Sequence, residues 1–116
     1  MGKESPPKNI VAVVFFQEES GNEPVRKWLK GLPKKVRQIV GEDIKTVQYG
    51  WPLGMPLVRS LEKGLWEVRS SIPDGIARVI FKMIDGEMVL LHGIVKKTQK
   101  TPRQDIETAL ERVKRY

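Results

Sequence analysis

The sequence predicts a single α+β domain with an antiparallel sheet of four to five strands, two helices towards the N-terminus and one helix at the C-terminus. The chain has 116 residues, 40% of them hydrophobic, which suits one compact core. Strand-forming runs separated by short turns occupy residues 57–96. Helical spacing of apolar residues is confined to the segments before and after that region. We therefore expect the helices to pack on one face of an antiparallel sheet.

The first nine residues, MGKESPPKN, form a largely polar segment with two adjacent prolines, which we expect to be a flexible leader before a domain at residues 10–116. Residues 10–16 predict the first strand, because they are rich in β-branched and aromatic side chains and too few for a buried helix. The same run is too short to cross a membrane. A glutamine and two glutamates follow it in place of a cleavage site, so we expect neither a signal peptide nor a membrane segment.

Two helices are predicted after the first strand. Asn22 can cap the first helix, and Pro24 suits its first turn. Gly31 and Pro33 end it, and the second helix begins near Pro33. Apolar residues recur along the second helix with helical spacing, so we expect one of its sides to cover the sheet. These residues are Val36, Ile39, Val40, Ile44 and Val47.

The region 57–96 predicts four strands, at residues 57–61, 65–71, 76–84 and 87–96. Between the last two strands, Asp85 and Gly86 favour a two-residue type I′ turn, which needs positive φ at both positions. Such a turn pairs Ile84 with Glu87 and makes the two strands antiparallel. The register of this hairpin then follows from that first pair.

Continuing the register places Arg78 opposite Gly93 on one face of the hairpin, with Lys82 and Lys97 on the same face. The glycine would leave room for a ligand beside the guanidinium group. His92 falls on the other, apolar face, where we interpret it as a hydrogen-bonded core or rim residue in preference to a catalytic base. A one-residue bulge in the strand would reverse its side.

The C-terminal segment predicts the last helix. Thr101 is positioned as its cap, with Pro102 at the first helical position and Gln104 at the third, a pattern typical of a capping box. Its apolar stripe consists of Ile106, Ala109, Leu110 and Val113.

The charge balance is strongly basic, with 21 Lys and Arg against 14 Asp and Glu and a net charge of +7. Residues 88–104 contain no acidic residue, and a polyanion is the natural partner of such a segment. The chain has no cysteine and one histidine, which excludes disulfides and thiolate nucleophiles and argues against a metal site. We therefore expect a cytoplasmic protein that uses no metal and no cofactor.

Three segments carry a family resemblance: LWEVR at residues 65–69, IARVIF at residues 76–81 and LLHGIVKKTQKTP at residues 90–102. Together they resemble the RelE/ParE toxin superfamily, and within it the HigB-like branch related to a phage-derived host-inhibition protein. The resemblance implies a RelE-like fold and the toxin of a type II toxin–antitoxin pair. Such toxins are commonly endoribonucleases that cut mRNA in the ribosomal A site. The implied partners are a cognate antitoxin protein and mRNA on the ribosome.

The same resemblance implies roles for individual residues. Arg78 matches the arginine that contacts the scissile phosphate, Lys97 the basic residue at the end of the last strand, and Arg69 the arginine at the end of a preceding strand. Catalysis is therefore assigned to these three residues. The tyrosine that many RelE-type enzymes place after the basic run has no equivalent here, so the general base is not assigned. Substrate binding is assigned to four further cations, Lys82, Lys96, Lys100 and Arg103.

The predicted mechanism is metal-independent attack by the 2′-hydroxyl of RNA, with the cations stabilising negative charge in the transition state. Two alternatives stay open at this point. One is a ParE-like toxin that inhibits DNA gyrase without chemistry of its own, and the other is a basic nucleic-acid-binding module. Trp51, in a loop rich in Gly and Pro, is a candidate for stacking on a base.

Overall fold

A computed structural model describes residues 10–116. The leader predicted at residues 1–9 lies outside the described residues. The predicted order of elements is confirmed, with one strand, two helices, four strands and a final helix. Their bounds are β1 (Ala12–Phe15), α1 (Pro24–Lys30), α2 (Lys34–Gly50), β2 (Val58–Ser60), β3 (Leu65–Ile72), β4 (Gly75–Ile84), β5 (Glu87–Lys96) and α3 (Arg103–Lys114).

The strands form one five-stranded sheet in the order β1-β5-β4-β3-β2, which confirms the α+β class. Strands β2 to β5 are antiparallel neighbours, as expected for strands joined by short turns. Strand β1 instead pairs with β5 in parallel, so the sheet is mixed and not wholly antiparallel. No hairpin joins β1 to β5, because both N-terminal helices and three strands separate them along the chain.

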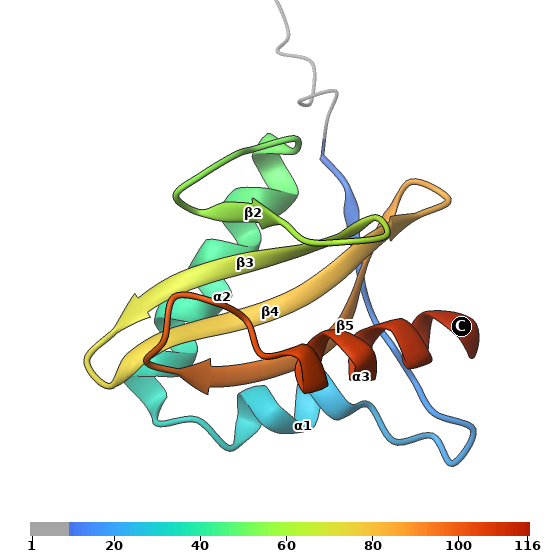
Figure 1. The fold of residues 1–116 in the computed structure, drawn as a ribbon, viewed down its shortest axis with the longest axis horizontal. Coiled ribbons are helices and arrows are strands. Elements are labelled where there is room, and N and C mark those ends of the chain that lie inside the picture. Colours follow the sequence, from blue (N-terminus) through green and yellow to red (C-terminus); the bar gives the residue numbers. More distant parts are fainter. Residues whose placement is uncertain (1–9) are drawn as a thin grey trace, which may run out of the picture.

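The helices lie on both faces of the sheet, not on one as expected (Figure 1). Residues of α1 and α2 pack with Val79, Phe81 and Leu90 in one apolar cluster. Residues of α3 pack in a second cluster with Ile80 and Leu91, which point to the opposite face. Both faces of β4 and β5 are therefore apolar over part of their length, and each apolar surface needs its own cover.

The Asp85-Gly86 turn is confirmed, with φ of 51° and 79° at its two residues. The predicted register holds from the Ile84–Glu87 pair as far as the pair of Phe81 with Leu90. A β-bulge then shifts the pairing by one residue, so that Ile80 lies opposite His92. From this point to the end of the hairpin, the predicted faces of β5 are wrong.

The bulge changes the surroundings of Arg78, which lies opposite Ile94 and not opposite a glycine. Gly93 instead pairs with Val79 and faces α1. A Cβ atom at Gly93 would lie 2.3 Å from the ring of Trp28, so glycine is required there by the close approach of the indole. The space expected beside the Arg78 guanidinium is therefore absent.

Candidate functional site

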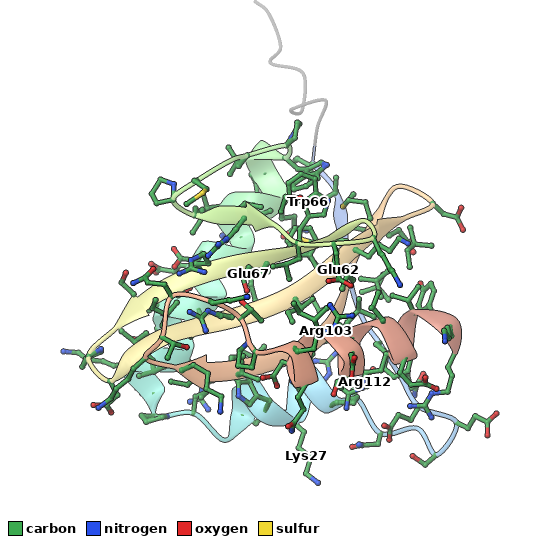
Figure 2. The ribbon with its side chains drawn as sticks, in the orientation of Figure 1. Lys27, Glu62, Trp66, Glu67, Arg103 and Arg112 are labelled. Carbon is green, nitrogen blue, oxygen red and sulfur yellow. The ribbon has the colours of Figure 1, made fainter. Side chains whose placement is uncertain are left out.

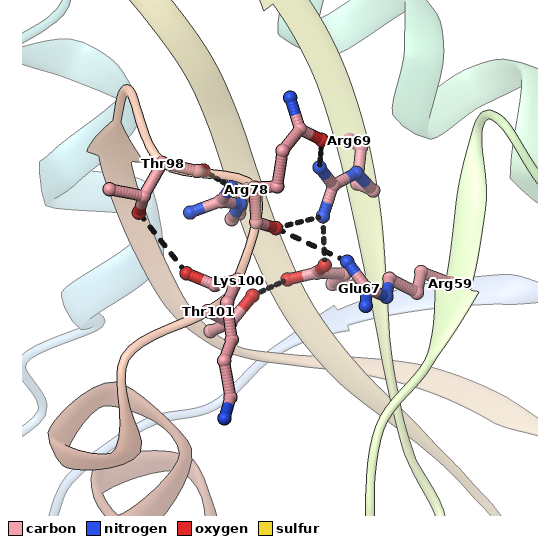
Figure 3. Close-up of polar contacts among 8 residues, drawn as sticks. Arg59, Glu67, Arg69, Arg78, Thr98, Lys100 and Thr101 are labelled. Carbon is pink, nitrogen blue, oxygen red and sulfur yellow. Dashed lines mark hydrogen bonds and ion pairs between the residues drawn. The ribbon is translucent and has the colours of Figure 1, made fainter.

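The α3-facing surface of the sheet changes from apolar to charged along β3 and β4. On β3, the side chains of Leu65, Glu67 and Arg69 alternate onto this surface, and on β4 it carries Ile80 and then Arg78. Helix α3 covers the apolar part. The charged part lies under the loop at residues 97–102, which connects β5 to α3 (Figure 3).

Three guanidinium groups meet under this loop, from Arg59 on β2, Arg69 on β3 and Arg78 on β4. We call them the arginine cluster. Nη1 of Arg69 and Nη1 of Arg59 both donate to the carbonyl oxygen of Gln99, at 3.1 and 3.2 Å (Figure 3). Nη2 of Arg69 also donates to the Gln99 side chain, and Arg78 donates to the carbonyl oxygen of Thr98. Three cations from three neighbouring strands therefore converge on two consecutive carbonyl groups.

Glu67 is the one carboxylate that pairs with the arginine cluster within residues 10–116. Its side chain is fully buried, accepts from Nη1 of Arg69 at 2.8 Å, and accepts from the Thr101 hydroxyl at 2.5 Å. The predicted role of Thr101 as a helix cap is therefore wrong, because its hydroxyl serves Glu67 and α3 begins after Pro102 without a side-chain cap. One negative charge faces three positive charges, so the cluster keeps a net positive charge.

Arg78 has no exposed surface. Its Nε and Nη1 atoms are buried and have no hydrogen-bond partner among residues 10–116. Each unsatisfied buried donor costs about 1–3 kcal/mol. Burial lowers the pKa of the Arg78 guanidinium, Glu67 opposes this shift, and the nearby charges of Arg69 and Arg59 add to it. Arginine nevertheless stays charged at neutral pH, so the cluster presents a buried cation with unused donors.

The lysines predicted for the site do not all lie near the arginine cluster. Lys96, Lys97 and Lys100 are exposed on or beside the loop that covers the arginine cluster. A Cβ atom built on Gly75 would lie 3.3 Å from Cγ of Lys97, so Lys97 lies next to the β3–β4 turn. Lys82 lies apart from them, with its Cε 3.3 Å from the position of a Cβ at Gly64 in the β2–β3 turn.

Arg103 also lies outside the arginine cluster, at the start of α3. Its guanidinium group forms ion pairs with Glu62 and Glu107, and Figure 2 shows Glu62 and Arg103 facing each other across the gap between the β2–β3 turn and α3. Two carboxylates therefore balance its charge. The expectation of a single open face shared by Arg78, Lys82 and Lys97 is wrong, because α3 and the β5–α3 loop cover that face.

Arg59 is not among the site residues predicted from the sequence. It lies in the short strand β2, directly opposite Glu67 in β3. A signal was present, because the short connection at residues 61–64 predicts a β2–β3 hairpin that brings Arg59 close to the charged part of β3. Arg59 also lines a pocket of about 510 Å³ together with Arg69, Ser71 and Gln99.

Two other candidate residues have structural partners. The bulge turns His92 towards α3, where its Nε2 lies 2.7 Å from Oδ1 of Asp105 and its Nδ1 lies 3.3 Å from Nη1 of Arg112. The histidine is thus hydrogen-bonded, on the face opposite to the predicted one. Trp51 is wrong as an exposed stacking residue, because its ring packs edge-on against Trp66 at 5.1 Å.

The sequence comparison adds a family to this geometry. Residues 27–114 match the family described as Phage derived protein Gp49-like (DUF891). The chain belongs to the Gp49-like family. This is a RelE-like toxin family associated with toxin–antitoxin systems. The matched range includes the whole arginine cluster and the loop above it. No curated protein sequence matches the chain.

The Gp49-like chain thus combines a toxin-family fold with a cationic centre at one end of its sheet. No helix within residues 10–116 has the length and apolar character needed to cross a membrane. Chemically, the cluster offers planar, permanently charged donors that suit phosphate oxygens. It can hold an anion and stabilise negative charge that develops on it.

Proposed function

We propose that this chain is the toxin of a type II toxin–antitoxin pair, and that it cuts mRNA on the ribosome while a cognate antitoxin restrains it. The arginine cluster carries this proposal, above all Arg78 with its two unused buried donors. A phosphodiester is the anion that several guanidinium groups can contact at once through separate oxygens. A gyrase inhibitor without chemistry has no need for such a centre.

The proposed reaction needs no metal. The 2′-oxygen of one ribose attacks the adjacent phosphorus, and the bond from phosphorus to the 5′-oxygen of the next nucleotide breaks. A base takes the 2′-hydroxyl proton and an acid gives a proton to the leaving 5′-oxygen, which leaves a 2′,3′-cyclic phosphate and a 5′-hydroxyl. Negative charge grows on the phosphoryl oxygens in the transition state, where Arg69 and Arg78 stabilise it more than in the ground state.

The β5–α3 loop must move for this reaction, because Arg78 has no exposed surface. In the described structure the carbonyl groups of Thr98 and Gln99 accept the hydrogen bonds that phosphate oxygens would accept. Moving the loop exchanges neutral carbonyl acceptors for negatively charged phosphate oxygens, with which guanidinium groups form bidentate, charge-paired contacts. Lys97 lies at the start of this loop and is our candidate for proton transfer, with Lys96 and Lys100 as phosphate contacts.

The test is cleavage of a defined mRNA in a purified translation system, with new 5′ ends mapped by primer extension. Arg78→Met should reduce the cleavage rate at least 100-fold, the order expected for loss of one transition-state donor. Lys27→Met is the matched control, because it also removes one positive charge and Figure 2 shows that side chain pointing away from the molecule. It should cut at the wild-type rate.

A second arm tests the nucleophile. An mRNA with one 2′-deoxynucleotide at the mapped cleavage position should resist cutting there while neighbouring positions remain sensitive. Intact mRNA throughout, together with inhibited DNA supercoiling by gyrase, would favour the ParE-like alternative. Wild-type cleavage by a folded Arg78→Met variant would remove Arg78 from the reaction.

A further inference from the structure

A pocket of about 510 Å³ opens beside the arginine cluster, between the β5–α3 loop and the segment that leads into β2. Its volume lies within the range of roughly 300–1,000 Å³ that is typical of small-molecule sites. The pocket and the cluster share Arg59 and Arg69, so a ligand in the pocket would lie next to whatever the cluster binds.

Part of the pocket lining is cationic and polar. It is formed by Arg59, Arg69, Gln99 and the hydroxyl-bearing Ser71. Arg59 forms one hydrogen bond in the described chain, through Nη1 to the Gln99 carbonyl, and no ion pair there. A guanidinium has five N–H donors, so most of those on Arg59 are available to a ligand. Asp43 brings a single carboxylate to the pocket, against the two arginines.

A second part of the lining is apolar. It is formed by Met55, Pro56 and Leu57, with Ile76 from β4. Met55 is 70% exposed, although its thioether side chain is one that usually packs into a core or a binding surface. A ligand that fills this pocket therefore needs both an apolar part and an anionic part. A nucleotide has both.

We infer that this pocket binds the nucleotide next to the linkage held by the arginine cluster, with its phosphate on Arg59 and Arg69 and its base against Met55 and Pro56. The inference rests on the proposed function, because it identifies the substrate as a single-stranded polynucleotide. It makes Arg59 a substrate-binding residue in addition to the residues predicted from the sequence. It also separates two tasks, since the cluster holds the reacting phosphate and the pocket positions its neighbour.

The test measures binding of nucleoside 3′,5′-bisphosphates to the full chain by isothermal titration calorimetry. Inorganic phosphate alone and the nucleoside alone serve as probes for the cationic and the apolar parts of the lining. The bisphosphate should bind at least tenfold more tightly than either probe. Arg59→Met should weaken its binding at least tenfold, and Met55→Ala should weaken it about threefold to tenfold.

Two controls keep this result interpretable. Met55→Ala changes an exposed side chain, so it tests the pocket without risk to the fold even if Arg59→Met proves unstable. Lys27→Met removes one charge elsewhere and should bind the bisphosphate as the wild type does. Equal losses in the Arg59 and Lys27 variants, or no binding of any bisphosphate, would overturn the inference.

The outcome is separable from that of the proposed function. Bisphosphate binding that depends on Arg59 and Met55, in a protein that never cuts mRNA, would support the pocket and reject the endoribonuclease. mRNA cleavage that is unaffected by Arg59→Met and Met55→Ala would reject the pocket and support the endoribonuclease. A third measurement uses an uncleavable 2′-deoxy-substituted oligoribonucleotide. If the free bisphosphate binds but Arg59→Met leaves the affinity for this oligonucleotide unchanged, the inference is also overturned. The pocket would then bind free nucleotides and not the polynucleotide.

Discussion

The α3-facing surface of the sheet has two halves of opposite character, although the same strands build both. In one half, Leu65, Ile80 and Leu91 pack against α3 and exclude water. In the other half, two residues further along β3 and β4, Glu67 and Arg78 are equally buried but lie under a loop held by hydrogen bonds. Water offers apolar side chains no equivalent of the contacts that they make in the core. The hydrogen bonds of the arginines, in contrast, can be exchanged for hydrogen bonds to an anion. The first half therefore serves stability, and the second half holds a cationic centre under a loop, which a phosphate would replace in the proposed function.

The largest expected effect on stability comes from the apolar half. Ile80→Ala should lower the free energy of unfolding by about 2–5 kcal/mol, because Ile80 is fully buried between strands and α3 and its loss leaves a cavity. Urea denaturation followed by circular dichroism measures this loss. A loss below about 1 kcal/mol would mean that α3 collapses into the space, and that this half is less tightly packed than its burial indicates.

Arg78→Met makes the matching change in the charged half, two residues along the same strand. We expect the free energy of unfolding to stay constant or to rise by up to about 3 kcal/mol, because an apolar side chain of similar length removes a buried cation with unsatisfied donors. The same urea experiment measures it. A loss as large as that of Ile80→Ala would show that the guanidinium group holds the fold together, and the contrast between the two halves would fail.

The two halves also differ in how far they could be predicted. The order of elements and the Asp85-Gly86 turn follow from local patterns, and both are confirmed. The bulge has no local signal, because it satisfies two tertiary demands at once: Leu91 enters the apolar cluster under α3 while His92 meets Asp105. A shift of one residue changes the face of every residue that follows.

Only part of the candidate site could be predicted, because some of its contacts also depend on tertiary structure. Arg69 and Arg78 come together because β3 and β4 pair directly, which their short turn already requires. Arg59 depends on a three-residue strand that the sequence marks weakly, and the path of the loop over Arg78 depends on long-range hydrogen bonds. Roles of single residues in the reaction stay predictions, since they rest on the resemblance and on this geometry.

A smaller effect is expected where the loop is fastened. Thr101→Val removes the hydroxyl that donates to buried Glu67 and should lower the free energy of unfolding by about 1–2 kcal/mol, because the carboxylate loses a hydrogen bond. Amide hydrogen exchange of residues 97–101 should become faster while that of α3 beyond the first turn stays unchanged. Faster exchange along the whole of α3 would contradict the separation of the two halves, because the loop and helix would then open as one unit.

The smallest effect is expected at the exposed ion pair between Glu62 in the β2–β3 turn and Arg103 at the start of α3. The hydrogen bond from Arg103 holds the pKa of Glu62 below its ordinary value, with burial acting in the opposite direction. A lowered carboxyl pKa in the folded state stabilises the protein above the pKa of the unfolded chain, and this contribution is lost as the pH falls through the folded value. Both side chains are solvated, so screening keeps the contribution small.

Replacement of that arginine, Arg103→Gln, separates charge from packing at this position. The pKa of Glu62, followed by NMR of its side-chain carboxyl group, should return towards the ordinary value. The melting temperature should fall slightly at neutral pH, and the difference from the wild type should vanish in strong acid, where Glu62 is protonated in both proteins. A difference that persists in acid would show that Arg103 acts by packing against the β2–β3 turn.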